Sequence, residues 1–120
     1  MEEEKYLVLY PDGSMRWIHT QHKDICSSFR QAIGCKWLEN VTLPYGFCCI
    51  VDEVGKIRKD PQLVNPLASR FYPGTMFGDP LVGPVVFARI GLYQGESDWL
   101  PLTDHQLSIV ELVIGKRVPQ

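Results

Sequence analysis

The 120-residue sequence has no large excess of charge of either sign and no long apolar run. Its formal net charge of −2 removes the strongly basic surface on which non-specific nucleic-acid binding depends. The same charge is too small for an acidic mimic of DNA. The apolar runs fall far short of the roughly 20 residues that span a bilayer. The sequence therefore argues against both nucleic-acid and membrane partners.

The sequence also lacks a disulfide framework and an export signal. Its four cysteines, Cys26, Cys35, Cys48 and Cys49, follow no spacing that is typical of disulfide-rich domains. The first residues, 1–5, are acidic, whereas a secretory signal begins with basic residues and continues into an apolar run. We therefore expect a cytoplasmic protein with free thiols.

Catalytic and metal-binding motifs are absent as well. The sequence contains no nucleophile elbow, no phosphate-binding loop of the Walker type and no His-Glu-x-x-His motif. The nearest approach to a metal set is His19, His22, Cys26 and Cys35, which has no paired Cys-x-x-Cys. These four side chains meet only if the fold brings them together. We expect no catalytic residues, no metal and no cofactor.

What the chain does contain is a series of β-prone runs separated by turn residues, together with three helical segments. The β-prone runs are 5–10, 15–20, 36–43, 47–51 and 85–90. The helical segments are 22–33, 63–72 and 103–115, and 91–98 is predicted as a loop. This order predicts one α+β domain over residues 1–120. We expect a mostly antiparallel sheet of about five to six strands, with two or three short helices on one face.

Helix-start and helix-stop residues fix the ends of these segments. Asn65 followed by Pro66 predicts an N-cap with proline in the first helical position. Thr103 and Gln106 have the spacing of a capping box. A glycine after each of the two longer helical segments, at 34 and at 115, predicts a left-handed C-terminal stop.

Eight short segments that follow an N-terminal strand carry a family resemblance by their order. They are Ile33-Gly34, Trp37–Val41, Leu43-Pro44, Phe47–Val51, Asp52–Lys56, Asn65–Ala68, Gly83–Phe87 and Leu102–Gln106. In this order the chain resembles the small proteins grouped as domain of unknown function 3846, which occur in phages, plasmids and gut-bacterial mobile elements. The family has no established common activity. The resemblance therefore implies a context, mobile-element biology in a bacterial cytoplasm, in which small proteins often bind a host defence component or its signalling molecule.

The candidate binding site joins the predicted helix at 65–70 to the Pro/Gly-rich loop at 73–80, where the chain departs from the family pattern. Its members are Asn65, Arg70, Tyr72, Phe77 and Asp79. An amide at Asn65 can hydrogen-bond to a ligand, and a guanidinium at Arg70 can pair with a phosphate or carboxylate. The two aromatic rings can cover a flat or apolar ligand face. The competing interpretations are a helix cap for Asn65 and a solvated charge for Arg70.

Three functions are compatible with these features. The first is a non-enzymatic protein of a phage or mobile element that binds or inhibits a host protein, which predicts an exposed apolar patch in 75–81. The second is a sponge for an anionic small molecule such as a nucleotide. It predicts a concave pocket with Arg70 or Arg89 and an aromatic wall, often at the interface of a homo-oligomer. An enzyme ranks last, because it requires titratable groups that converge in one cleft.

Overall fold

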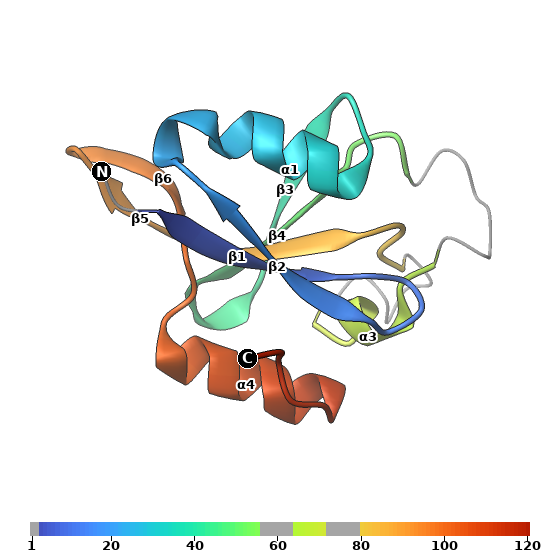
Figure 1. Cartoon of the computed structure of the whole chain (residues 1–120). Helices are drawn as coiled ribbons and strands as arrows, with labels where there is room; N and C mark the ends of the chain where they lie inside the picture. The colour runs from blue at the N-terminus through green and yellow to red at the C-terminus, as the bar shows by residue number, and fades with distance from the viewer. Residues whose placement is uncertain (1–2, 56–63, 72–79) are drawn as a thin grey trace.

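One antiparallel sheet organises the protein (Figure 1). The computed structural model describes residues 3–55, 64–71 and 80–120. Within these residues the strands are β1 (Glu4–Leu9), β2 (Met15–Thr20), β3 (Leu38–Thr42), β4 (Phe47–Asp52), β5 (Val85–Tyr93) and β6 (Glu96–Leu100). The helices are α1 (Ile25–Ile33), α3 (Pro66–Ser69) and α4 (Asp104–Ile114), with 3-10 turns η1 (His22–Asp24) and η2 (Pro44–Gly46). The predicted α+β fold class is confirmed.

Strands β1 and β2 form the predicted N-terminal hairpin. The turn closes with a hydrogen bond from Tyr10 N to Ser14 O at 2.8 Å. Inside it, the Asp12 carboxylate accepts from the backbone N and the hydroxyl of Ser14. Gly13 adopts a φ of +87°, which a side chain would disfavour. This turn chemistry was visible in the sequence because all of its contacts are local.

Strand β5 is the centre of the sheet, whose order is β2-β1-β5-β4-β3 with β6 also paired to β5. Phe87 lies between Leu7 of β1 and Cys49 of β4, so β1 and β4 occupy opposite edges of β5. Arg89 lies between Phe47 of β4 and Leu100 of β6. Strands β1 and β6 therefore occupy the same edge of β5, one after the other. We call the point where β1 leaves that edge and β6 takes it the fork.

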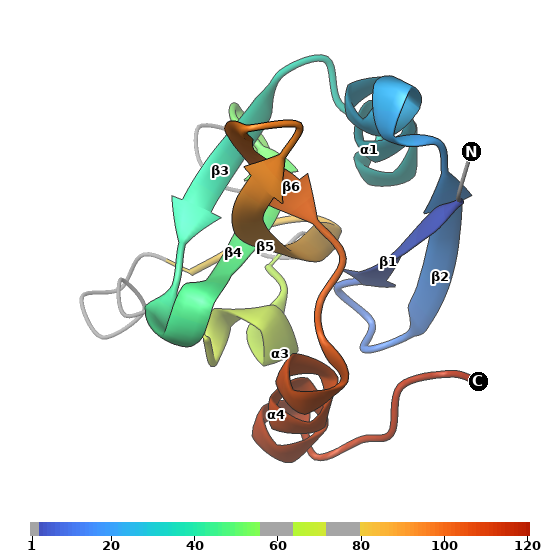
Figure 2. The same ribbon diagram turned by 90° about the vertical axis from the view of Figure 1, so that its left-hand side faces the viewer.

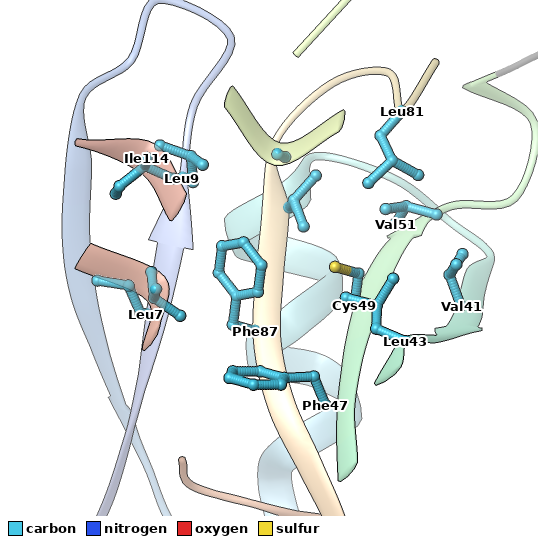
Figure 3. Packing of buried hydrophobic residues seen from close by; sticks show 13 residues of the cluster. Leu7, Leu9, Val41, Leu43, Phe47, Cys49, Val51, Leu81, Phe87 and Ile114 are labelled. Carbon is cyan, nitrogen blue, oxygen red and sulfur yellow. The ribbon is translucent and has the colours of Figure 1, made fainter. Parts of the chain in front are cut away.

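Helices cover both faces of the sheet, which corrects the expectation that they lie on one face (Figures 1 and 2). On one face, α1 packs through Phe29 and Ile33 against alternate strand residues such as Val8 and Ile50. On the other face, α3 and α4 cover a core that includes Phe87, Cys49 and Leu7 (Figure 3). The physical reason is visible in β1, β4 and β5, whose apolar runs bury side chains on both faces instead of alternating with polar ones.

The start of α4 and the C-terminal ends of α1 and α4 follow the sequence prediction closely, whereas α3 covers only four residues of the predicted 63–72. Thr103 and Gln106 form both bonds of the capping box at the start of α4. Gly34 and Gly115 end α1 and α4 with φ of +75° and +72°. No helix in the described parts of the chain combines the length and apolar character needed to cross a membrane.

The prediction of a loop over 91–98 is wrong. Strand β5 continues to Tyr93, and β6 returns from Glu96 after the two-residue turn Gln94-Gly95. Both turn residues have positive φ, +51° and +84°, as the tightest hairpin turns require. The sequence of β6 is polar and shows no apolar alternation, so its strand state comes from pairing with β5 rather than from its own composition.

Candidate functional site

A cleft of about 890 Å³ opens at the fork, and we call it the fork cleft. It lies between the start of β1, the turn that follows β2, and the β5–β6 hairpin. Figure 2 views the molecule from the side that carries β6 and the N-terminus. The chemically active side chains in its lining are Glu4, Lys5, His22, Lys23, Arg89 and Tyr93. The cleft exists because two strands share one edge of β5 and diverge where they meet.

His22 bridges the two sides of the fork. Its Nδ1 lies 2.9 Å from Oε1 of Glu4, and its Nε2 lies 2.7 Å from Oδ2 of Asp98. The imidazole ring is 11% exposed and stacks on Tyr93 with a centroid separation of 3.7 Å. One side chain thus joins β1 to β6, which share no backbone pairing among the described residues.

The geometry around His22 favours the charged ring. An ionised carboxylate only accepts hydrogen bonds, and each ring nitrogen faces one, so both nitrogens must carry a proton. Burial lowers the pKa of His22, but the hydrogen bonds to Asp98 and Glu4 together outweigh it and raise the pKa above its ordinary value. An imidazolium in this position has no lone pair with which to act as a general base.

A tyrosine supports the Glu4 side of this bridge from the core. The Tyr6 hydroxyl donates to Oε1 of Glu4 at 2.8 Å, the same oxygen that faces His22. Burial, followed by this hydrogen bond, raises the pKa of the Tyr6 phenol far above its usual range, so it stays a donor. On the opposite side, Oδ1 of Asp98 accepts from the backbone N of Trp99 at 2.7 Å. Both carboxylates are therefore held in position by groups other than His22.

Arg89 forms the opposite wall of the fork cleft. Its Nε donates to the carbonyl oxygen of Pro101 at 2.8 Å. Its Nη1 lies over Gly91, where an added Cβ would come within 2.8 Å of Nη1 and 2.7 Å of Leu100 Cδ1. Gly91 therefore leaves the space in which the guanidinium folds back along the sheet. Among the described residues this is the hydrogen bond that Arg89 makes, so the terminal nitrogens remain for a ligand.

Charges in the fork cleft are unevenly paired. The carboxylates of Glu4 and Asp98 are tied to His22, and Glu3 lies 3.1 Å from His19. The cations Lys5, Lys23 and Arg89 form no salt bridge within the described part of the chain. With His22 protonated, four positive charges stand against three negative ones. Lys5 lies over the ring of Trp17, with its Nζ 4.4 Å from the ring centroid, so Lys23 and Arg89 are the cations of the lining left to interact with a ligand.

Asn65 is a structural residue rather than a surface ligand. It is fully buried, and its Oδ1 accepts from the backbone N of Ala68, which is the helix cap expected from the sequence. Its Nδ2 donates to the carbonyl oxygens of Leu9 and Gly83 at 2.9 and 3.0 Å. Every hydrogen-bonding atom of the side chain is occupied, so no part of it is available to a bound molecule.

Arg70 is exposed, but its guanidinium also has a structural partner. Nη1 donates to Val113 O at 3.1 Å and to Ile114 O at 3.4 Å. These carbonyls lie in the last turn of α4, where backbone acceptors have no partner within the helix. Arg70 thus links α3 to the C-terminal end of α4, and it lies outside the lining of the fork cleft.

The other predicted site residues, Tyr72, Phe77 and Asp79, lie outside the described residues. The apolar patch expected over 75–81 can be assessed only at its end. There, Leu81 is 1% exposed and belongs to the core, so it adds nothing to a surface patch. Arg89 and Tyr93, by contrast, both line the fork cleft.

The four residues of the weak metal set do not converge. His22 is bound to carboxylates, His19 is exposed, and Cys26 is exposed on α1. No group of three or more His, Cys, Asp or Glu side chains with metal-binding geometry occurs in the parts of the chain that the structure describes.

The sequence missed the fork cleft because its members are far apart along the chain. His22 lies 18 residues from Glu4 and 76 residues from Asp98, and Asp98 was assigned to a loop. One available signal was Gly91, which directly follows the predicted run 85–90. The structure places it inside β5, and a glycine inside a strand often marks a close approach by another group.

A comparison with protein families identifies the chain. Residues 4–114 match the family described as Domain of unknown function (DUF3846). The match includes every strand of the sheet and all three walls of the fork cleft. The chain belongs to this family, as the resemblance implied. Comparisons with curated proteins and with solved structures gave no match.

Proposed function

We propose that this protein is a non-enzymatic binding protein that takes a small anionic ligand in the fork cleft. The observation that carries the proposal is the pairing of charges. Each carboxylate at the cleft is matched with a histidine, whereas Lys5, Lys23 and Arg89 have no acidic partner in the described chain. A guanidinium held at Nε presents its terminal nitrogens as a fork that suits a phosphate or carboxylate.

Two further features support binding rather than catalysis. The titratable groups do converge, contrary to the expectation from the sequence, but His22 is engaged at both nitrogens. A cleft of about 890 Å³ is within the range of small-molecule sites and can hold a nucleotide-sized ligand. We place this activity in the cytoplasm and in the mobile-element context that the family resemblance implies. Binding of a host protein through 75–81 stays a prediction.

The test is calorimetric titration and thermal shift with mononucleotides, cyclic mononucleotides and inorganic phosphate, with uncharged nucleosides as the control ligands. We expect the phosphate-bearing ligands to bind and to raise the melting temperature, because a ligand of the folded state stabilises it by mass action. The affinity should fall as salt is added, because part of the interaction is electrostatic. Equal binding of nucleosides, or no binding of any anion, would contradict the proposal.

Arg89→Ala is the diagnostic variant. Loss of charge-assisted hydrogen bonds of about 1.5–3 kcal/mol predicts an affinity lower by roughly ten- to a hundredfold. Arg30→Ala is the matched control, since Arg30 is exposed on α1 and lies outside the lining of the cleft. Lys23→Ala removes an exposed cation of the cleft and serves if Arg89→Ala does not fold. Unchanged anion affinity in both cleft variants would show that the anion does not bind in the fork cleft.

A further inference from the structure

At the fork, β1 no longer pairs with β5 through its backbone, and side-chain contacts join β1 to β6 instead. The register of β1 with β5 covers Leu7 to Leu9, and β6 pairs with β5 from Arg89 to Tyr93. The first part of β1 therefore has no backbone partner in β5 or β6 among the described residues. There, a long hydrogen bond from the Tyr6 hydroxyl to Trp99 O, at 3.4 Å, joins the two strands. The shorter link is the chain of contacts from Glu4 through His22 to Asp98.

This link depends on one proton. A neutral imidazole has one N–H and one lone pair, so only one of the two carboxylates can then accept a hydrogen bond from the ring. The other carboxylate faces a lone pair at 2.7 or 2.9 Å and is repelled. Protonation therefore holds Glu4 and Asp98 to the same ring, and deprotonation releases one of them.

The groups around His22 have opposing effects on its protonation. Those on the packed elements are Glu4 and Tyr6 on β1, Arg89 and Tyr93 on β5, and Asp98 on β6. Its own turn adds the exposed Lys23 and Asp24. The two carboxylates in direct contact favour the proton, whereas burial opposes it. An anion bound in the cleft would add negative charge near the imidazolium and so favour its proton further.

We infer that proton uptake by His22 closes the fork and that anion binding in the cleft is coupled to this proton. The inference rests on the proposed function for its ligand and on the Glu4–His22–Asp98 geometry for its proton. Two effects act together when His22 is protonated. The cleft gains one positive charge, and its β1 and β6 walls are tied to each other. By linkage, an anion that binds better to the protonated state also draws a proton from solvent.

We call the contact of protonated His22 with both Glu4 and Asp98 the clamp. It is tested first without a ligand, by NMR titration of the histidine rings. The chain has three histidines. We expect the pKa of His22 to lie above the ordinary value of a histidine side chain, and Asp98→Asn to lower it. A pKa of His22 at or below the ordinary histidine value would overturn the clamp.

The coupling is tested by calorimetry with a 3′,5′-cyclic mononucleotide, whose phosphodiester keeps a single charge from pH 6 to 9. We expect the affinity of the native protein to fall as the pH rises through the titration of His22, by at most tenfold per pH unit for one proton. In two buffers of different ionisation enthalpy, binding should take up protons. The His22→Gln variant should bind the cyclic mononucleotide with little dependence on pH. If that variant does not fold, Asp98→Asn replaces it and should move the pH dependence of binding to lower pH.

The outcomes separate the two proposals. Binding that is independent of pH and unchanged in His22→Gln overturns the coupling and leaves the anion site in place. Absence of anion binding at every pH overturns the proposed function and the coupling together, while the NMR titration still decides whether the clamp exists.

Discussion

Asn65 joins three separate segments through one side chain. Its amide caps α3 at Ala68 and donates to the carbonyl oxygens of Leu9 on β1 and Gly83 before β5. Ser69 adds to this cluster, since its hydroxyl donates to Asn65 O at 2.7 Å. A buried amide with all its partners fixes where the short helix sits on the sheet, because any shift leaves a polar group without a partner.

Asn65→Ala should therefore destabilise the protein by about 3 kcal/mol. Loss of the cap costs about 1 kcal/mol, and two buried carbonyls left without donors cost about 1–3 kcal/mol more. Urea unfolding followed by circular dichroism measures the change. Thr103→Ala is the control, because it removes a cap from α4 at an exposed position and should cost about 1 kcal/mol. Equal losses in the two variants would show that the buried donors of Asn65 contribute nothing.

The roles of single residues were predictable from the sequence where their contacts are local and were not predictable where the contacts are distant. The caps at Asn65 and Thr103 were predictable because each acceptor lies three residues from its donor. The buried role of the Asn65 amide was not, because its two acceptors lie 56 and 18 residues away. The same is true of His22, whose partners are brought together only by the sheet.

Elements α3 and α4 meet through Arg70. Its guanidinium satisfies carbonyls at the C-terminal end of α4, where a cation also complements the helix dipole. The contact is partly exposed, so its energetic value is small. Arg70 directly follows the four-residue helix α3. The sequence did not reveal its role because the carbonyl that it binds at the end of α4 lies 43 residues further along the chain.

Arg70→Ala should lower stability by about 0.5–1 kcal/mol, as expected for an exposed hydrogen bond at a helix end, and should leave anion affinity unchanged. Thermal unfolding and calorimetric titration with a cyclic mononucleotide measure the two effects side by side. Arg70→Lys is the control, because it keeps the charge near the end of α4 and should recover part of the stability. A tenfold loss of anion affinity in Arg70→Ala would restore Arg70 to the binding site.

The hairpin formed by β5 and β6 shows the limit of pattern-based prediction for a whole element. The apolar half of β5, Val85–Ala88, was recognisable because it is fully buried. The second half of β5 and all of β6 are partly exposed, and each is a strand because it pairs with the other. Since one wall of the fork cleft comes from these two segments, the site could not be predicted before the hairpin was known.

For the molecule as a whole, β4 provides an internal probe of stability. Cys48 and Cys49 are both inaccessible to solvent in a strand that is paired on both sides. Burial raises the pKa of the Cys48 thiol to about 12 and that of Cys49 well above its ordinary value. The thiolate is the reactive form, so both thiols should be inert while the protein stays folded.

Alkylation of a Cys26→Ser/Cys35→Ser variant should therefore report global unfolding. We expect Cys48 and Cys49 to react at least about a thousandfold more slowly than in urea-unfolded protein, as a stability of 5 kcal/mol or more implies. Mass spectrometry of iodoacetamide adducts over a urea series measures this rate. The exposed Cys26 of the native protein is the control and should react readily. Labelling of Cys48 as fast as Cys26 would contradict the buried position of β4.

The central place of β5 also has a consequence for synthesis of the chain. The hairpins β1–β2 and β3–β4 both precede residue 53, and within the described sheet they are joined only through β5. During synthesis on the ribosome, these two hairpins cannot join into one sheet until residues 85–93 have emerged. During that interval each presents a strand edge with no neighbour. The pace of translation over the last third of the message thus sets how long the nascent chain stays exposed to aggregation.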